Sequence, residues 1–194
     1  MKKLTSMVQV QKLCRPLLAG GVYVITSADT FLRDEGISLV RAAACGEREE
    51  VDDFNADELD AREGLGSALE LARSYPMMAQ TRWVHISHIE SVKDKEAQKL
   101  LEYLADPMPT TVLCLSAGKL DGRTKMPKQL AKLSTWMADL ALPSQREMPD
   151  WIRTRAGSSG LQMDNQAAVL MAEVIGTNLQ LVERSLEMLA NYVY

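Results

Sequence analysis

The fold class is decided by the segment Thr111–Ser116, TVLCLS, a short run of β-branched and apolar residues without polar alternation. A strand with one solvated face alternates polar and apolar residues, whereas a strand covered on both faces is apolar throughout. The preceding sequence, SVKDKEAQKLLEYLADP, has helical periodicity, with Ser91 and Asp94 spaced as a capping box and Pro107 at its end. Its predicted buried face consists of Ala97, Leu100, Leu101 and Leu104. A helix followed by a strand buried on both faces indicates an α/β fold.

The same alternation of helices and strands extends in both directions along the chain. Further strands are predicted at residues 22–26, 51–55, 83–87 and 136–140. Helices are predicted at residues 66–73 and 127–133, and also after the first strand, where one face consists of Leu32, Gly36, Leu39, Val40 and Ala43. Such alternation predicts right-handed βαβ units and a mostly parallel sheet.

The character of the sequence changes after Leu142, because no strand pattern follows Pro143. We therefore predict an α/β domain over residues 1–142 and a small helical bundle, or lid domain, over residues 143–194. In the bundle, Ser144 and Glu147 are spaced as a second capping box.

Two further helices are predicted in the bundle. Asp164 precedes one of them as its cap, and Gly176 ends it. The other begins near Asn178. The predicted inward-facing residues are Ala167, Leu170, Met171 and Val174 in the first, and Leu179, Val182, Leu186, Leu189 and Val193 in the second.

Composition and cysteine spacing exclude several classes of protein. Hydrophobic residues make up 46% and charged residues 25% of the chain, as in an ordinary globular protein. The N-terminal sequence MKKLTSMVQVQKLC lacks the apolar core of a signal peptide, and no apolar run is long enough to span a membrane. We expect a cytoplasmic protein with no membrane contact. Cys14, Cys45 and Cys114 are too widely spaced for a disulfide framework or a zinc site, and Cys114 is predicted to fill the core.

No catalytic, metal or cofactor site is predicted. The turn after the first strand, ITSADTFLRDEG, has neither the glycines nor the lysine that a phosphate-binding loop requires. Gly118-Lys119 does not supply such a loop either, because Leu113 stands where the earlier glycine is needed. His85 and His88 are expected to face opposite sides of a strand, so that they do not share a metal ion.

Two surface features remain as candidate contact sites. One is a basic cluster, which fits DNA phosphates or an acidic partner and also an ordinary solvated helix face; it consists of Lys119, Arg123, Lys125, Lys128 and Lys132. The other is Met77-Met78, which follows Pro76 in SYPMMAQTRWVHI. These methionines are either core residues at the end of the preceding helix or an exposed apolar pair at a turn.

Several stretches resemble the delta subunit family of bacterial DNA polymerase III, the clamp-opening subunit of the clamp loader. They are VYVITSADTFLRDEGI, YPMMAQTRWVHI, LLEYLADPMPTTVLCLSAGKLDGRTK and MPDWIRTRAGSSGLQMDNQAAVLMAEVIGTNLQLVERSLEML, in the same order as in the family. The resemblance covers the family's first two domains. It implies an AAA+ fold that has lost its nucleotide site, and a longer protein with a third, collar domain that this chain does not contain.

The resemblance also implies a function for the methionines. In the family, an apolar pair at this turn plugs a hydrophobic pocket on the sliding clamp, so Met77 and Met78 are expected to bind the clamp (beta subunit). The family pattern is a Leu-Phe pair, so the methionines lack its aromatic anchor. The chain is then expected to open the clamp for loading onto primed DNA, as a non-catalytic subunit of the DNA-directed DNA polymerase (nucleotidyltransferase) holoenzyme.

Further partners follow from the same resemblance. The ATPase subunits (gamma/tau) and delta prime are expected to join through the collar domain, and primed DNA is expected to enter the complex. Two alternatives remain open. One is an inert stator like delta prime, although its zinc-binding cysteines and arginine motif are missing here. The other is a DNA-binding module that uses Lys119, Arg123, Lys125 and Lys128.

Overall fold

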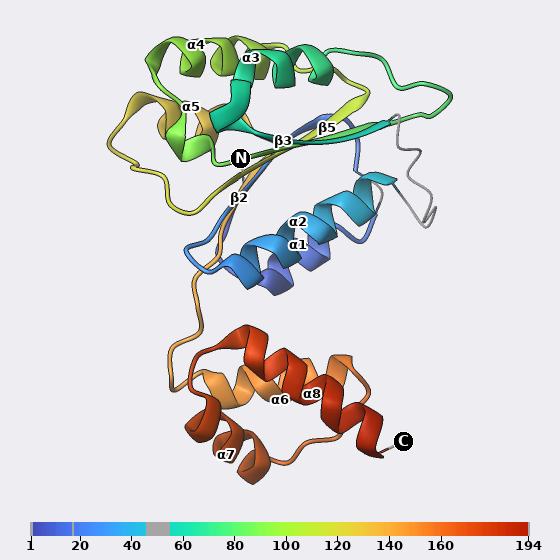
Figure 1. Cartoon of the computed structure of the whole chain (residues 1–194), viewed down its shortest axis with the longest axis vertical. Helices are drawn as coiled ribbons and strands as arrows, with labels where there is room; N and C mark the ends of the chain where they lie inside the picture. Colours follow the sequence, from blue (N-terminus) through green and yellow to red (C-terminus); the bar gives the residue numbers. More distant parts are fainter. Residues whose placement is uncertain (1, 17, 46–54, 194) are drawn as a thin grey trace. The chain divides into compact units, whose positions relative to one another are not determined.

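The chain forms two compact units, Met1–Ala141 and Leu142–Tyr194. The computed structural model describes residues 2–16, 18–45 and 55–193. The first unit contains a sheet with helices on both faces, and the second contains helices (Figure 1). The boundary predicted from the sequence was Pro143. Each unit buries its own apolar residues.

The first unit is built on a six-stranded parallel sheet in the order β1-β6-β2-β5-β4-β3. Its strands are β1 (Lys2–Leu4), β2 (Gly21–Thr26), β3 (Ala56–Asp60), β4 (Arg82–Ser87), β5 (Thr111–Ala117) and β6 (Trp136–Asp139). In the middle of the sheet, Val24 lies opposite both Leu115 and Met137. All residues of β2 and β5 are buried, which confirms that TVLCLS is covered on both faces.

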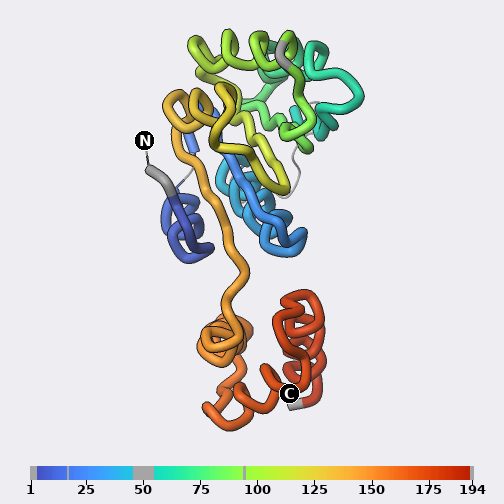
Figure 2. The backbone as a smooth tube through the Cα atoms, turned by 90° about the vertical axis from the view of Figure 1, so that its left-hand side faces the viewer, coloured from blue at the N-terminus to red at the C-terminus, as the bar shows by residue number. Residues whose placement is uncertain are grey.

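Helices cover the two faces of this sheet. On one face lie α1 (Met7–Leu13) and α2 (Thr30–Cys45), and on the other lie α3 (Ala61–Ala72), α4 (Asp94–Ala105) and α5 (Lys125–Leu133) (Figures 1 and 2). Gly36 allows α2 to approach the sheet closely, because a Cβ there would lie 3.1 Å from Cγ2 of Ile25 and 3.3 Å from Cδ1 of Leu140.

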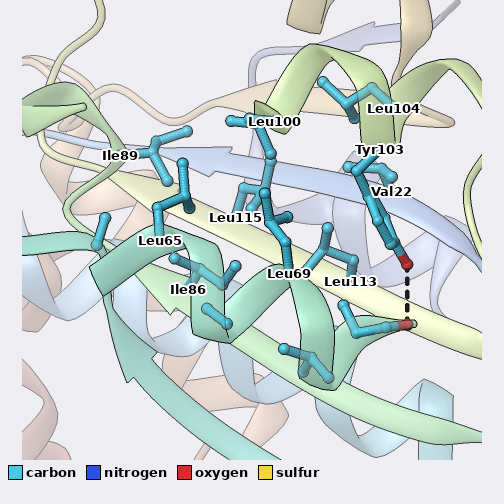
Figure 3. Packing of buried hydrophobic residues seen from close by; sticks show 14 of the residues in the cluster. Val22, Leu65, Leu69, Ile86, Ile89, Leu100, Tyr103, Leu104, Leu113 and Leu115 are labelled. Atoms are coloured by element: carbon cyan, nitrogen blue, oxygen red, sulfur yellow. Dashed lines mark hydrogen bonds between the residues drawn. The ribbon is translucent and has the colours of Figure 1, made fainter. Parts of the chain in front are cut away.

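A hydrophobic core lies between the sheet and the helices α3, α4 and α5 (Figure 3). Leu65 and Leu69 of α3 and Leu100 of α4 pack onto the strands. Tyr103 of α4 is also buried there, and its hydroxyl donates a hydrogen bond to the Ala72 carbonyl at 3.2 Å. That carbonyl is in the last turn of α3, where helical partners are missing, so Tyr103 completes the end of the helix.

The second unit consists, within residues 142–193, of α6 (Met148–Ser158), α7 (Asn165–Ile175) and α8 (Leu179–Val193). Its core includes Met148 and Ile152 from α6, Ala172 from α7 and Val182 from α8. Nε of Arg155 contacts Oε2 of Glu183 at 2.6 Å, which links α6 to α8 through a partly buried ion pair.

Most predicted elements of the first unit are confirmed, whereas β1, α1 and β3 were not predicted. The strands predicted at residues 22–26, 83–87 and 136–140 correspond to β2, β4 and β6. Residues 51–54 of the strand predicted at 51–55 lie outside the described residues, and β3 occupies Ala56–Asp60. β1 and α1 were not predicted, because the alternating N-terminal sequence has no long apolar run.

The predicted caps have mixed outcomes. Asp164 does cap α7, accepting the Ala167 N–H at 2.7 Å, and Gly176 ends this helix with φ +72°. The Ser91–Asp94 capping box is wrong: α4 begins at Asp94 after an uncapped Lys93, and the Ser91 hydroxyl donates to the His88 carbonyl.

The Ser144–Glu147 capping box is half correct. Glu147 accepts the Ser144 N–H at 2.8 Å, as in a capping box. The Ser144 hydroxyl, however, donates to the same carboxylate instead of accepting from the backbone, and α6 begins only at Met148.

The predicted buried face of α7 is wrong at three of its four residues, while the fourth, Met171, is half-buried. Ala167, Leu170 and Val174 are exposed, whereas Ala168 and Ala172 are buried. Apolar residues lie all around this helix, so periodicity alone did not select one face. In α8 the inward positions Leu179, Val182 and Leu186 are confirmed, but Leu189 is exposed, and the Val193 side chain lies outside the described part of the structure.

Candidate functional site

The connection from α3 to β4 carries several exposed apolar side chains. It is a loop that extends beyond the end of α3 (Figure 1). We call Tyr75, Pro76, Met77 and Met78 the methionine tip. Tyr75 is 74% exposed, Met77 is 61% exposed and Met78 is fully exposed. The alternative in which Met77 and Met78 fill the core is therefore wrong.

The methionine tip is held by Asn55, a residue that sequence reasoning missed. Met77 donates its N–H to Oδ1 of Asn55 at 2.6 Å, and Nδ2 of Asn55 donates to the Met77 carbonyl at 2.7 Å. The Asn55 residue is only 2% exposed. One asparagine just before a strand, 22 residues from its partner, has no sequence pattern that distinguishes it from a turn residue.

Both ends of the connection are also anchored. On the helix side, the Arg73 guanidinium lies 5.1 Å from the ring centroid of Tyr103, which itself bonds to Ala72. On the strand side, the buried Arg82 places its NH2 group 2.5 Å from Oδ2 of Asp57. The methionine tip thus projects from two fixed points at the amino edge of the sheet, where β4 begins.

The basic cluster is solvent-exposed, as the sequence indicated. Lys119 and Arg123 lie in the loop after β5, and Lys125, Lys128 and Lys132 lie on α5. Arg123 is not a free cation, because its Nε lies 3.0 Å from Oδ1 of Asp121, and this hydrogen bond lowers the pKa of Asp121. Nζ of Lys128 donates to the Arg123 carbonyl at 3.0 Å and thereby fixes the loop against the helix.

The turn after β2 does not fit a nucleotide. At the N-terminus of α2, Oδ1 of Asp29 accepts the Leu32 N–H at 3.0 Å, so a carboxylate occupies the position where a helix would bind phosphate. Ser27 orders this turn by accepting the Asp29 N–H. The turn has no glycine or lysine, so a phosphate placed here would face the Asp29 carboxylate and not a set of backbone N–H donors.

A small cavity lies beside this turn, between α2 and the carboxyl ends of β4 and β5. Its volume is about 130 Å³, below the roughly 300–1,000 Å³ typical of ligand pockets. Its lining includes both His85 and His88, which corrects the expectation that they face opposite sides. His88 follows the strand end with φ +55°, and this left-handed residue turns the chain toward the cavity.

The two histidines have different side-chain partners. Nε2 of His85 lies 2.9 Å from the Ser116 hydroxyl, and Nδ1 of His88 lies 3.1 Å from Oδ2 of Asp60. Burial lowers the pKa of His85, so its imidazole is neutral at pH 7. Among the described residues, no three His, Cys, Asp or Glu side chains gather as metal ligands.

The three cysteines differ in their burial. Cys114 is fully buried in β5, as predicted, and this burial raises the pKa of its thiol. Cys14 and Cys45 are partly exposed free thiols, and burial raises the pKa of Cys14 to about 11.

Within the part of the chain that the structure describes, no helix combines the length and apolar character needed to cross a bilayer.

The parallel sheet followed by a helical unit is an AAA+-like fold. A Bacillus subtilis DNA clamp loader delta protein has a similar fold, with a TM-score of 0.75 and 23% identity over 96% of this chain and 56% of that one. A DNA polymerase III gamma subunit-related protein from Thermotoga maritima is more distant, with a TM-score of 0.58 and 10% identity over 93% and 57% of the two chains. RuvB from Thermotoga maritima has a TM-score of 0.52 and 12% identity, over 95% of this chain and 62% of that one.

The family model for the DNA polymerase III delta subunit matches residues 23–138, which is more than half of this chain. The chain therefore belongs to the delta subunit family of the clamp loader, as its sequence motifs indicated. It spans only about 56% of the Bacillus subtilis protein. No curated protein matches the sequence.

Proposed function

We propose that this chain binds the sliding clamp through the methionine tip and helps to open the clamp ring for loading onto primed DNA. The observation that carries the proposal is that Met77 and Met78 are both exposed while the backbone beneath them is fixed by a buried asparagine.

The energetics favour a partner that covers the methionine tip. Burying a methionine side chain stabilises a complex by roughly 1.5–3 kcal/mol, so the adjacent pair has enough apolar surface to act as a hot spot. Methionine is flexible and polarisable, and it adapts to an apolar pocket without requiring one shape. A fixed backbone lowers the entropy cost of binding.

Opening of the ring requires a difference in affinity. If the chain binds the opened clamp more tightly than the closed one, it shifts the clamp toward the open state by that difference and no more. ATP acts in this scheme on other loader subunits, because the turn after β2 does not fit a nucleotide. The ATPase subunits (gamma/tau) and delta prime remain proposed partners through a collar domain.

The test is surface plasmon resonance of the full chain on the cognate clamp. Met77→Ala/Met78→Ala should weaken the affinity roughly 30-fold or more, because two buried side chains are truncated. Met188→Ala is the matched control, since Met188 is an exposed methionine on α8 in the other unit. Unchanged binding by the double variant would exclude the methionine tip as the contact.

DNA contact is a second candidate function, supported by the exposure of Lys119, Lys125, Lys128 and Lys132. Such residues bind phosphates and release counterions, so their contribution falls steeply with salt. Arg123 is already paired with Asp121, so the positive charge that the cluster offers to phosphates comes mainly from its four lysines. This contact is compatible with clamp binding, because the loop after β5 and the methionine tip lie at opposite edges of a parallel sheet.

A further inference from the structure

The contact between Asn55 and Met77 joins two loops that are 22 residues apart in the sequence. A primary amide has one acceptor oxygen and a donor nitrogen, and here both are used on one residue. Asn55 therefore does for Met77 what a neighbouring strand does in a sheet, because it pairs the N–H and the carbonyl together. Both bonds are short, and the Asn55 side of each is buried, since Asn55 is 2% exposed.

These two bonds restrict the backbone on both sides of Met77. On one side, the ring of Pro76 fixes its own φ. On the other, Met78 has φ +55°, a left-handed conformation that is uncommon for a residue other than glycine. A residue stays in such a conformation only where its surroundings determine it. Within the described contacts of this loop, the Asn55 side chain is the group that fixes the adjacent peptide units.

We infer that Asn55 is a positioning residue for partner binding: it holds Met77 and Met78 in the conformation that the partner recognises. This inference rests on the proposed function of the methionine tip. Without the amide, both methionine side chains remain, but the segment must be ordered when it binds. Ordering a loop reduces affinity although every side chain that touches the partner is still present.

Two variants of Asn55 separate positioning from simple loss of fold. Asn55→Ala removes both hydrogen bonds, whereas Asn55→Asp has nearly the same volume and keeps an acceptor for the Met77 N–H but loses the donor. Asn191→Ala is the matched control, because Asn191 is an exposed asparagine on α8. For each variant of the full chain, the affinity for the clamp and the midpoint of urea unfolding are measured.

Hydrogen exchange gives a readout that does not depend on the clamp. The Met77 amide should exchange faster in Asn55→Ala, because its acceptor is gone, while the amides of β4 and β5 keep their protection. Clamp binding should weaken about tenfold in Asn55→Ala and less in Asn55→Asp. Met77 exchange equal to that of the wild type would overturn the inference.

The decisive experiment is a double-mutant cycle with Met77→Ala/Met78→Ala. We expect Asn55→Ala to have little further effect on clamp binding in the variant without the methionine side chains, because there is nothing left to position. An equal loss in both backgrounds would show a structural role and overturn the inference. If the methionine variant binds normally, the proposed function fails; if only Asn55→Ala binds normally, the inference alone fails.

Discussion

Asp29 and Asn55 show how single polar side chains decide what two edges of the sheet can bind. At the carboxyl edge, the Asp29 carboxylate takes the Leu32 N–H that a nucleotide phosphate would otherwise approach. At the amino edge, Asn55 takes both backbone groups of Met77 and leaves the methionine side chains in solvent. One side chain thus fills a potential ligand site, and the other presents a potential contact site.

The buried His85 should make the free energy of unfolding depend on pH. Burial lowers its folded-state pKa below the ordinary value of 6.5, so the unfolded chain takes up the proton first. Stability is therefore full above pH 6.5 and falls as the pH decreases from that value toward the lowered pKa of folded His85. The slope contributed by one proton is at most about 1.4 kcal/mol per pH unit.

Urea unfolding between about pH 5 and pH 7.5 measures this effect. His85→Gln should reduce the slope of the unfolding free energy with pH. Ser116→Ala serves as the control, because it removes the hydrogen-bond partner of His85 but keeps the imidazole. A slope that is the same in His85→Gln and in the wild type would contradict the assignment.

At the scale of elements, the parallel sheet separates the two candidate contact surfaces. The methionine tip precedes β4, and the loop with Lys119 follows β5. Because these strands are parallel, the two surfaces lie at opposite ends of the strands. The base of the methionine tip is part of the main core, since Tyr103 of α4 bonds to the last turn of α3. Helix packing and tip position are therefore coupled, whereas the basic cluster depends on α5 and its loop.

The lysines of α5 and of the loop before it should contribute to the binding of DNA. Changing Lys119, Lys125 and Lys128 to Gln should weaken binding of the chain to primed DNA and lower the slope of log K against log salt by about 1 for each phosphate that is no longer neutralised. Changing Lys93, Lys95 and Lys99 to Gln removes the same charge from the region of α4 and is the control. Equal effects of the two triple variants would assign the binding to overall charge and not to this cluster.

At the scale of the molecule, the methionine tip and Asn55 belong entirely to the first unit. That unit has its own sheet and core, with Leu100, Leu113 and Leu115 fully buried within it. The second unit has a separate core around Ile152 and Val182. Clamp binding should therefore not require the helical unit.

The fragment 1–141 tests this expectation. It should unfold cooperatively and bind the clamp within about threefold of the full chain, because no residue proposed for the contact is removed. Circular dichroism with urea measures its folding, and surface plasmon resonance measures its binding. A folded fragment with much weaker binding would place part of the clamp contact in α6, α7 or α8.

The sequence by itself determined the alternation of strands and helices, the doubly covered strand at Thr111–Ser116 and the absence of a phosphate-binding turn. These properties depend on local composition and spacing, which a single chain displays directly. Periodicity was insufficient where several faces were apolar, as in α7, where Ala168 and not Leu170 is buried. It also did not detect β1, which lies at the edge of the sheet beside β6.

Only the tertiary structure decided between a buried and an exposed Met77-Met78, because the two alternatives have the same sequence and differ in where α3 ends. The same holds for Asn55, whose role depends on a partner 22 residues away. It holds also for His85 and His88, which line one cavity because of the left-handed turn at His88. Contacts between distant segments are fixed by packing, and packing has no local signature in the sequence.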